Sequence, residues 1–490
     1  MSERRLVLAL DQGTTGSTAL VVDGRTHVLG RGYREIPQHY PEPGWVEHDP
    51  EDLWTATLAA AKDALAAARA TGADLAAIGI TNQRETTLLW DRASGAPLAR
   101  AIVWQDRRTA ERCRSLDADR IAAKTGLVPD PYFSATKVEW LLGRLKPPAS
   151  RTAFGTVDSW LVHRLTGGRA HVTDPTNASR TMLYDIGAGR WDDGLLATFG
   201  VPREILPEVR PSSGVFAVAD ARWLGAEVPI AGIAGDQQAA LFGQGCFAAG
   251  TAKNTYGTGA FLLMNTGDVP VRSTHGLLTT VACGARGQSA YALEGSVFVA
   301  GAAIQWLRDG LGVIAAARES EAMARSVPDT GGVVFVPAFV GLGAPHWESG
   351  ARGAIFGLTR GTTRAHLVRA ALEAMAFATR EVLEAMTGDA GLALPGLKVD
   401  GGASANDWLM QLQADVLGLR VTRPRVVEST AMGAAGLAGL ATGVWKTADD
   451  FLAAREVDVF EPGRPVNEGW EQWKRAVAAT VGWAAWPGSK

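Results

Sequence analysis

Cysteine is scarce in this sequence. Three of the 490 residues are cysteine, and these residues, Cys113, Cys246 and Cys283, are far apart and form no C-x-x-C pair. An odd, scattered set excludes a disulfide scaffold, and the lack of clustered Cys and His excludes a zinc ribbon. No H-E-x-x-H motif is present either, so nothing in the sequence indicates a zinc site.

Long apolar runs are also lacking. The longest, Val333–Pro345, stops well short of the ~20 residues that cross a bilayer, so we expect no membrane insertion. The first residues imitate a signal peptide, but the apolar stretch is only Leu6–Leu10, and Asp11 follows where a cleavage site would stand. We interpret this stretch as a first strand and expect a cytoplasmic protein.

Neither sign of charge is in excess. The sequence has 48 Lys and Arg against 51 Asp and Glu, a net charge of -3. That balance gives no general attraction to nucleic acid or to an anionic membrane. The G-x-x-x-x-G-K-[ST] motif is absent, as is any Gly-Lys pair, which excludes a P-loop enzyme.

What is present is a globular composition with alternating strand and helix patterns. Apolar residues make up 47% and charged residues 20%. Leu6–Leu10 and Thr18–Asp23 read as a hairpin broken at Gly13–Gly16, and a helix capped by Asp49 follows. Leu75–Ile80 is the next apolar strand. Strands alternating with helices predict an α/β fold.

A strand, a Gly/Thr turn and a second strand recur half a chain later. Thr251–Tyr256, Gly257–Gly259 and Ala260–Met264 repeat the order of the first hairpin. Such a repeat suggests two similar domains that face each other. We place the boundary near residue 248, giving domains 1–248 and 249–490.

Further elements are predicted in the second half. Gly295–Leu307 and Thr363–Met386 read as helices, and Leu397–Asp400 as a strand. Ser404 with Asp407 makes a capping-box pattern for a helix that ends at Gly418. Glu428–Thr442 is a helix candidate rich in Ala and Gly.

The Gly/Thr turns are candidate phosphate-binding loops. Glycines permit close approach of the backbone, whose N–H groups bind anions together with the threonine hydroxyls. Asp11 stands beside the first turn, where a carboxylate suits a hydrated Mg²⁺ ion. The alternative is an ordinary hairpin turn.

Charged side chains follow two predicted strands. Asp236 follows Val228–Ala234, at the strand end where α/β proteins collect ligands, or else caps the next helix. Arg84 and Glu85 follow Leu75–Ile80 and suit a hydroxyl clamp, in which guanidinium donates and carboxylate accepts. The alternative is a solvated ion pair. Trp104 adds an aromatic wall.

Together these motifs resemble those of the glycerol kinases, members of the sugar-kinase family with the actin/hexokinase-like ATPase fold. The resemblance runs in order from about residue 6 to residue 445. It rests on Asp11–Thr15, Thr81–Thr86, Trp104–Thr109, Pro131–Ser134, Ala234–Ala239, Lys253–Gly259 and Asp400–Gly402, with further matches at Thr173–Tyr184 and Gly341–Arg360.

The resemblance implies two similar ribonuclease-H-like, actin-like ATPase domains with a cleft between them, and transfer of phosphate from Mg²⁺-ATP to glycerol. For that reaction we expect Asp236 to be the catalytic base, and Asp11 with Asp236 to lie on the metal side. The positions that match glycerol contacts are Arg84, Glu85, Trp104, Tyr132, Asp236, Gln237 and Phe261. The positions that match nucleotide contacts are Thr14, Thr15, Gly16, Thr258, Gly301, Gln305, Gly402 and Asn406. By analogy, a homodimer or homotetramer is expected.

The sequence departs from the family pattern at several places. Thr18 stands where many members carry an Arg near the nucleotide, so we count no contact there. Trp223–Pro229 lacks the Gly-Gly…Arg loop that binds fructose 1,6-bisphosphate in some relatives, and Glu227 would repel a phosphate. We therefore expect no inhibition by that bisphosphate. Ser212–Ala221 also lacks the His used for phosphotransfer activation in other relatives.

Other functions remain open on the sequence. A sibling kinase for erythritol or xylulose would share most motifs, although an indole at Trp104 leaves little room for a longer sugar. A filament-forming, actin-like ATPase would need no polyol pocket, and a plain sugar-binding module would need neither Asp11 nor the Gly/Thr turns.

Overall fold

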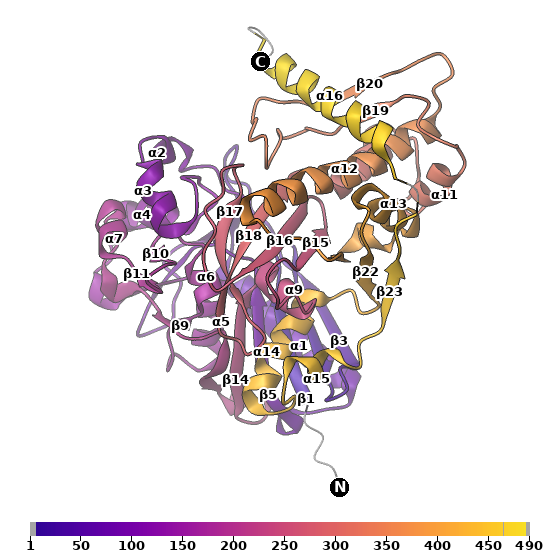
Figure 1. Cartoon of the computed structure of the whole chain (residues 1–490). Helices are drawn as coiled ribbons and strands as arrows, with labels where there is room; N and C mark the ends of the chain where they lie inside the picture. Colours follow the sequence, from indigo (N-terminus) through magenta and orange to yellow (C-terminus); the bar gives the residue numbers. More distant parts are fainter. Residues whose placement is uncertain (1–5, 464, 487–490) are drawn as a thin grey trace.

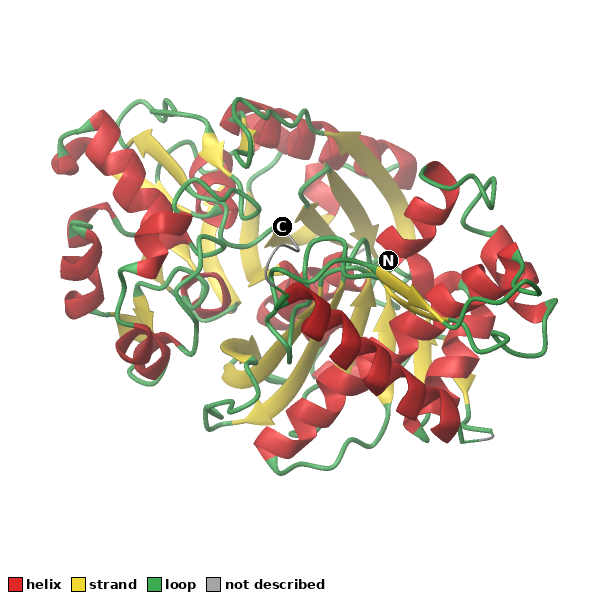
Figure 2. Cartoon of the chain, turned by 90° about the horizontal axis from the view of Figure 1, so that it is seen from above, coloured by secondary structure: helices red, strands yellow, loops and turns green. Residues whose placement is uncertain are grey.

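The computed structural model describes residues 6–463 and 465–486. It contains a six-stranded and a seven-stranded sheet, and helices cover both (Figures 1 and 2). The predicted α/β layering is therefore confirmed. Within the described ranges, none of the helices combines the length and the apolar character needed to span a membrane.

The first sheet belongs to the N-terminal half of the chain. Its strands lie in the order β13 (Ser213–Ala219), β14 (Val228–Gly235), β5 (Leu75–Asn82), β1 (Leu6–Gln12), β2 (Gly16–Val22) and β3 (Val28–Glu35). The second sheet has the order β17 (Leu278–Cys283), β18 (Ser289–Val297), β16 (Ala260–Gly267), β15 (Ala252–Tyr256), β21 (Leu397–Asp400), β22 (Val421–Pro424) and β23 (Val457–Phe460).

The two sheets repeat one pattern of strand directions. In the first, β1 pairs antiparallel with β2 and parallel with β5, and β5 pairs parallel with β14. In the second, β15 pairs antiparallel with β16 and parallel with β21, and β21 pairs parallel with β22. The antiparallel edge strands β13 and β23 complete the match. The short repeat in the sequence thus marks two similar lobes.

Both faces of the first sheet are buried, which explains the unbroken apolar run of β1. Leu6, Leu8 and Leu10 belong to the core under α1 (Pro50–Ala68). Val7 and Ala9 belong to the core on the opposite face, with α9 (Asp236–Gly243) and α14 (Ser429–Thr442). Side chains that alternate in a strand point to opposite faces, so a sheet covered twice needs apolar residues at every position.

Smaller helices and ribbons build the rest of the first lobe. The helices are α2 (Ala110–Arg114), α3 (Ala118–Thr125), α4 (Ser134–Leu145), α5 (Val157–Leu165), α6 (Pro175–Ala178), α7 (Asp193–Phe199) and α8 (Ala221–Leu224). The ribbons pair β4 (Glu47–His48) with β7 (Ala101–Ile102), β6 (Leu88–Asp91) with β8 (Thr152–Gly155), β9 (Val172–Thr173) with β12 (Glu208–Val209), and β10 (Tyr184–Asp185) with β11 (Arg190–Trp191).

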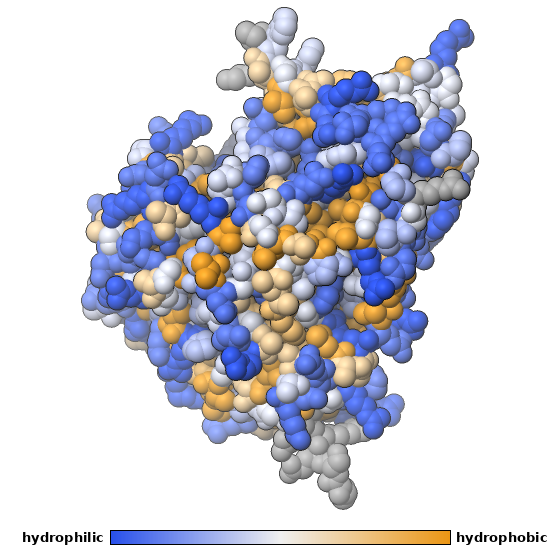
Figure 3. Space-filling model, in the orientation of Figure 1, coloured by the Kyte–Doolittle hydropathy of each residue, from blue (hydrophilic) through white to orange (hydrophobic). Residues whose placement is uncertain are grey.

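The remaining helices belong mainly to the second lobe. They are α10 (Gly301–Asp309), α11 (Glu319–Arg325), α12 (Arg364–Ala390), α13 (Asp407–Leu417) and α16 (Asn467–Ala484), and β19 (Val334–Val336) pairs with β20 (Ala354–Phe356). Helix α15 (Ala448–Leu452) instead packs on α14, since its Phe451 shares a core with Ala435. Most of the face seen in Figure 3 is hydrophilic, with hydrophobic side chains in a band across its middle.

Two predictions of local structure were wrong in detail. Residues 295–297 belong to β18, not to a helix, because they complete the ladder with β16, and the helix starts only at Gly301. Asn406, not Ser404, caps α13, since its Oδ1 accepts from the Leu409 N–H at 2.9 Å. Gly418 does end that helix in the left-handed conformation, as predicted.

Helix α14 links the second half of the chain to the first lobe. It lies against the strands of the first sheet (Figure 1), and its Ala431 and Ala435 share a core with Val7 and Ala9. A domain boundary at residue 248 therefore stays a prediction, because this helix packs on the opposite side of that boundary.

Close packing of α14 depends on glycine. A Cβ at Gly433 would lie 1.8 Å from the carbonyl oxygen of Ala239 in α9, and one at Gly79 of β5 would lie 2.2 Å from that of Ala434. Both neighbours are backbone atoms, which cannot turn aside as a side chain does. The Ala- and Gly-rich composition of this segment is thus a packing requirement.

We expect Gly433→Ala to lower the free energy of unfolding by about 1–3 kcal/mol, since the methyl group forces α14 away from α9. Gly388→Ala in α12 is the matched control, because nothing lies within 4 Å of its Cβ. The control is expected to gain about 0.5–1 kcal/mol from helix propensity. Urea titrations measure both, and equal stabilities for the two variants would contradict the packing argument.

Candidate active site

The ends of three parallel strands bring the predicted polar residues together. β1, β5 and β14 are neighbours with the same direction, so their carboxyl ends meet at one edge of the sheet. Thr81 of β5 is level with Asp11 of β1 and with Ala234 of β14. Asp236, the first residue of α9, lies just beyond that edge.

Arg84 lies at the centre of this edge and is not solvated, since 2% of its side chain is exposed. Its Nε is 3.1 Å from Asp236 Oδ1, and Nη2 donates to Tyr132 Oη at 3.4 Å. The side chain crosses Gly235, where a Cβ would lie 2.7 Å from Arg84 Cδ. The solvated-pair interpretation is therefore wrong for Arg84 and for the equally buried Glu85.

Glu85 is held in a strained backbone conformation. Its φ is 61°, a left-handed value that costs a residue with a side chain roughly 1–3 kcal/mol. Its Oε1 accepts from Arg180 Nε at 2.6 Å. Burial raises the pKa of the Glu85 carboxyl, and the positive charges of Arg180 and Arg84 oppose that rise. The carboxylate lies in the buried cluster beside Arg180 and Arg84.

Sequence reasoning missed two members of this cluster, Arg180 and Glu294. Glu294 Oε2 and Oε1 accept from Arg84 Nη1 and Nη2 at 2.7 and 2.9 Å, and Oε1 lies 3.2 Å from Arg180 Nη2. Although burial works against ionisation, the charges of Arg180 and Arg84 lower the pKa of Glu294 to about 2. Arg180 also lies over the rings of Tyr132 and Phe133, 5.3 and 5.1 Å from their centroids. The available signal was a single acid within the apolar strand β18.

Gln237 and Phe261 both accept hydrogen bonds from Lys253. The ammonium group of Lys253, on β15 of the second lobe, donates to Gln237 Oε1. It also donates to Thr255 Oγ1 at 2.8 Å and to the Phe261 carbonyl at 3.2 Å. The cluster at the strand ends is therefore closed by the second lobe.

Trp104 joins the cluster to the first Gly/Thr turn. Its Nε1 donates to Thr14 Oγ1 at 2.9 Å, and its ring meets that of Tyr132 edge-on at 5.5 Å. Gln83 supports the same turn, since its Nε2 donates to Gln12 Oε1 at 3.0 Å and to the Gly13 carbonyl at 3.3 Å. Thr15 is exposed at the tip, followed by buried Gly16.

Of the residues predicted to contact nucleotide in the second lobe, Gly301 lies directly against the Gly/Thr turn that carries Thr258. Gly301 N–H donates to the Gly257 carbonyl at 3.0 Å, and Ala302 N–H to that of Thr258 at 3.0 Å. Gly401 packs on the end of β15, where its Cβ would lie 2.4 Å from the Tyr256 carbonyl oxygen, and Gly402 follows it exposed. Gln305 is exposed on α10, whereas the Asn406 side chain is engaged in capping α13.

Asp11, the predicted metal-side carboxylate, lies among other negative charges. Burial, then the charges of Asp236 and Glu428, raise the pKa of its carboxyl to about 7. A bound cation would relieve this repulsion, and carboxylate oxygen suits Mg²⁺. Among the described residues no group of three or more His, Cys, Asp or Glu could hold a metal. A site in which Asp11 and Asp236 are the carboxylates suits an ion such as Mg²⁺ that keeps most of its water.

Comparisons with known proteins show the family of this chain. The N-terminal and C-terminal domain models of the FGGY family of carbohydrate kinases match residues 6–243 and 252–442. The chain belongs to the FGGY family of carbohydrate kinases. The family resemblance and the two-domain, actin-like fold class predicted from the sequence are confirmed.

Individual relatives show how similar this chain is to known kinases in sequence and in structure. The glycerol kinase of Deinococcus radiodurans is 56% identical over 495 residues, which cover 99% of each chain. A crystal structure of Plasmodium falciparum glycerol kinase with ADP shares 35% identity with a TM-score of 0.90, covering 97% of this chain and 98% of that one. The gluconate kinase of Lactobacillus acidophilus, 21% identical with a TM-score of 0.88 over 98% and 99% of the chains, shares the fold alone.

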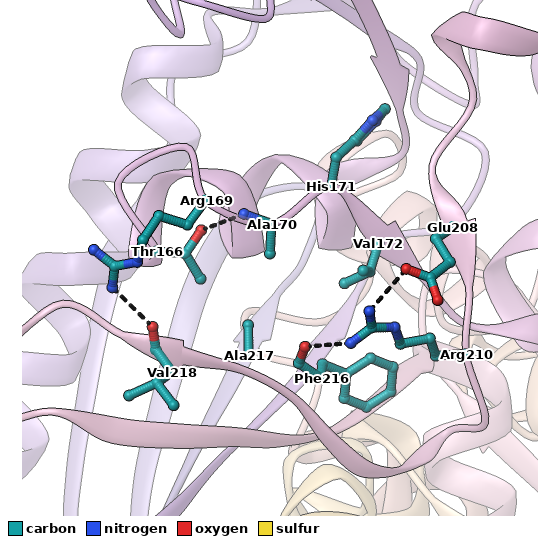
Figure 4. A pocket seen from close by; sticks show the side chains of 10 residues that line it. All are labelled: Thr166, Arg169, Ala170, His171, Val172, Glu208, Arg210, Phe216, Ala217 and Val218. Atoms are coloured by element: carbon teal, nitrogen blue, oxygen red, sulfur yellow. Dashed lines mark hydrogen bonds and ion pairs between the residues drawn. The ribbon is translucent and has the colours of Figure 1, made fainter.

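A surface pocket of about 390 Å³ is lined by side chains from residues 166–172 and 208–218 (Figure 4). Arg210 donates to the Phe216 carbonyl at 2.6 Å and Arg169 to the Val218 carbonyl at 3.3 Å. These carbonyls belong to the edge strand β13, so the arginines occupy acceptors that would otherwise pair with another strand. None of the predicted site residues lines this pocket, and its arginines have a structural role.

Lys137 of α4 supports Tyr132, one of the predicted glycerol contacts. Its side chain is fully buried, and Nζ donates to the Tyr132 carbonyl at 2.8 Å. Burial lowers the pKa of Lys137 to about 7, against the attraction of Glu85, Asp106 and Asp130. The folded protein therefore releases this proton more readily than the unfolded chain does.

This difference predicts a pH dependence of stability. Between the folded pKa of about 7 and the ordinary value of 10.5, the unfolded chain binds the proton that the folded chain has lost. The free energy of unfolding then rises with pH, by up to ~1.4 kcal/mol per pH unit from this group. In urea titrations from pH 7 to pH 9, Lys137→Met should show a smaller rise than the wild type. Identical slopes would contradict the buried, neutral lysine.

Proposed function

We propose that this chain transfers the terminal phosphoryl group of ATP to glycerol and forms sn-glycerol 3-phosphate. The contact between Arg84 and Asp236, 3.1 Å long, carries the proposal, because it joins a hydroxyl clamp to a carboxylate beside a phosphate turn. Full-length similarity to glycerol kinases of 55–56% identity supports the substrate. By the same analogy we expect a cytoplasmic homodimer or homotetramer.

Asp236 is proposed as the general base. Its Oδ1 accepts from the Gln237 N–H at 2.7 Å and contacts Arg84, while Oδ2 has no hydrogen bond within the described residues. A glycerol hydroxyl donating to Oδ2 would lose its proton there as its oxygen bonds to phosphorus and the bond from phosphorus to ADP breaks. The Arg84 guanidinium, 3.1 Å from Oδ1, orients the carboxylate.

The remaining pocket residues are proposed to recognise the other hydroxyls and the carbon chain. Arg84 and Tyr132 would donate, Glu85 would accept, and Gln237 would add its amide. Trp104 and Phe261 would pack on the carbons. A triol buries little area, so these hydrogen bonds decide affinity, and losing one partner from a buried site costs roughly 1–3 kcal/mol.

The nucleotide is proposed to lie between the two Gly/Thr turns. Thr14, Thr15 and Gly16 would bind its phosphates from the first lobe and Thr258 from the second, with Gly301, Gln305, Gly402 and Asn406 around the nucleoside. Asp11 and Asp236 would hold Mg²⁺ through water. When bound, the ion neutralises phosphate charge. Phosphoryl transfer depends chiefly on such positioning and charge neutralisation.

A substrate panel tests the proposed activity. ATP consumption should depend on glycerol and be much slower with erythritol, xylulose or no acceptor, because the Trp104 indole limits the length of the substrate. A preference for xylulose or erythritol would assign the chain to a sibling kinase. ATP-dependent polymerisation without any polyol-dependent turnover would favour an actin-like ATPase.

Asp236→Asn should lower kcat by about 10²–10⁴-fold, since the amide keeps the shape but cannot take the proton. Binding of ATP should change little, because the phosphate turns are untouched. Coupled ADP-release kinetics and nucleotide titration measure the two effects. A variant with near-normal kcat would remove Asp236 as the base.

A further inference from the structure

Two charged side chains of the second lobe reach the glycerol pocket of the first. Lys253 on β15 and Glu294 on β18 are both level with Leu263 of the intervening strand β16. Residues directly opposite each other in a ladder point to the same face of a sheet. Both side chains are fully buried. Their charges therefore lie in one row on the face that meets the first lobe.

Glu294 fixes the direction of the Arg84 guanidinium. Its two carboxylate oxygens accept hydrogen bonds from Nη1 and Nη2, at 2.7 and 2.9 Å, and so hold the outer end of the guanidinium. A guanidinium is planar and rigid, so a two-point contact at this end sets where Nε points. Nε then lies 3.1 Å from Asp236 Oδ1. Without Glu294 the Nη groups lose their charged partner. Only the longer contacts to Gln238 Oε1 at 3.2 Å and Tyr132 Oη at 3.4 Å then hold them away from Asp236 and Glu85, the carboxylates proposed to accept glycerol hydroxyls.

Lys253 fixes the direction of the Gln237 amide in a comparable way. An ammonium group only donates, so the amide must turn its oxygen, and not its nitrogen, toward Lys253 Nζ. The other donors of Nζ go to Thr255 Oγ1 and to the Phe261 carbonyl. The Gln237 NH₂ group is thereby directed away from the lysine and is available to a substrate oxygen.

We infer that Glu294 and Lys253 are positioning residues for the polyol, through which the second lobe orients the Arg84 and Gln237 side chains of the first. Glycerol recognition is then a property of both lobes together, although the groups that touch glycerol belong mainly to the first. This inference rests on the proposed function, because it assigns roles within the same pocket.

Glu294→Gln and Glu294→Asp test the role of Glu294. The Gln variant removes the charge, and we expect the KM for glycerol to rise about tenfold or more, with the KM for ATP within about twofold of the wild type. The Asp variant keeps the charge but withdraws it by one methylene, so its glycerol KM should lie between the two. If the Gln variant fails to fold, the Asp variant carries the same test.

Glu373→Gln is the matched control. It also neutralises a largely buried carboxylate that pairs with an arginine, Arg369 at 3.0 Å, but along α12. Its glycerol KM should equal that of the wild type. A purely structural role for Glu294 would lower the unfolding midpoint and leave the glycerol KM unchanged, and that result would overturn the inference.

Lys253→Met and Lys253→Arg test the second contact. Loss of the ammonium group frees the Gln237 amide, so the Met variant should also raise the glycerol KM more than the ATP KM, and Arg should restore part of the affinity. A glycerol KM unchanged in the Met variant would overturn the role of Lys253. Absence of glycerol-dependent turnover in the wild type would instead overturn the proposed function, so the two failures are distinguishable.

Discussion

Two arginines and two glutamates share a buried space where the lobes meet, and the geometry of the candidate site depends on how they neutralise one another. Arg84 and Arg180 face Glu85 and Glu294, and all four side chains are almost completely buried. Removing water from a charge is costly, so each charge requires a partner in a fixed place. This requirement holds Arg84 beside Asp236 and makes a site on the first lobe depend on a strand of the second.

The repeated strand pattern explains why chemistry gathers at this place. Each sheet puts a Gly/Thr turn between its central strand and the antiparallel neighbour, and puts further strand ends on the other side of the centre. In the first lobe Asp11 lies on the central strand, and Arg84 and Asp236 follow the two strands beyond it. In the second lobe the corresponding turn packs against Gly301 and Gly401. One architecture thus provides both the residues proposed to bind the polyol, mainly in the first lobe, and those proposed to bind the nucleotide in the second.

The predictable part of the site is the part that lies in short motifs. Arg84, Glu85 and Asp236 follow apolar strands directly, so position alone marked them, and the family resemblance supplied Tyr132, Gln237 and Phe261. Glu294 was missed because it is a single charge far from these motifs in sequence. Arg180 lies within the matching stretch Thr173–Tyr184, but no role was assigned to it. The Ser404 cap was wrong for a local reason: an intervening 3₁₀ turn shifts the helix start, so that Asn406 takes the capping position.

The sequence by itself determined the α/β class, the repeated hairpin with its Gly/Thr turn, and the identity of the groups at the strand ends. These follow from local periodicity, turn chemistry and motif order, which need no knowledge of distant contacts. Only the tertiary structure decided that Arg84 and Glu85 are buried, that α14 crosses back to pack on the first sheet, and that Lys253 and Glu294 reach across the lobes. Charge pairing in a buried space is set by which chain segments meet, and residues more than 200 positions apart, such as Arg84 and Glu294 with a separation of 210, leave no local pattern that records their meeting.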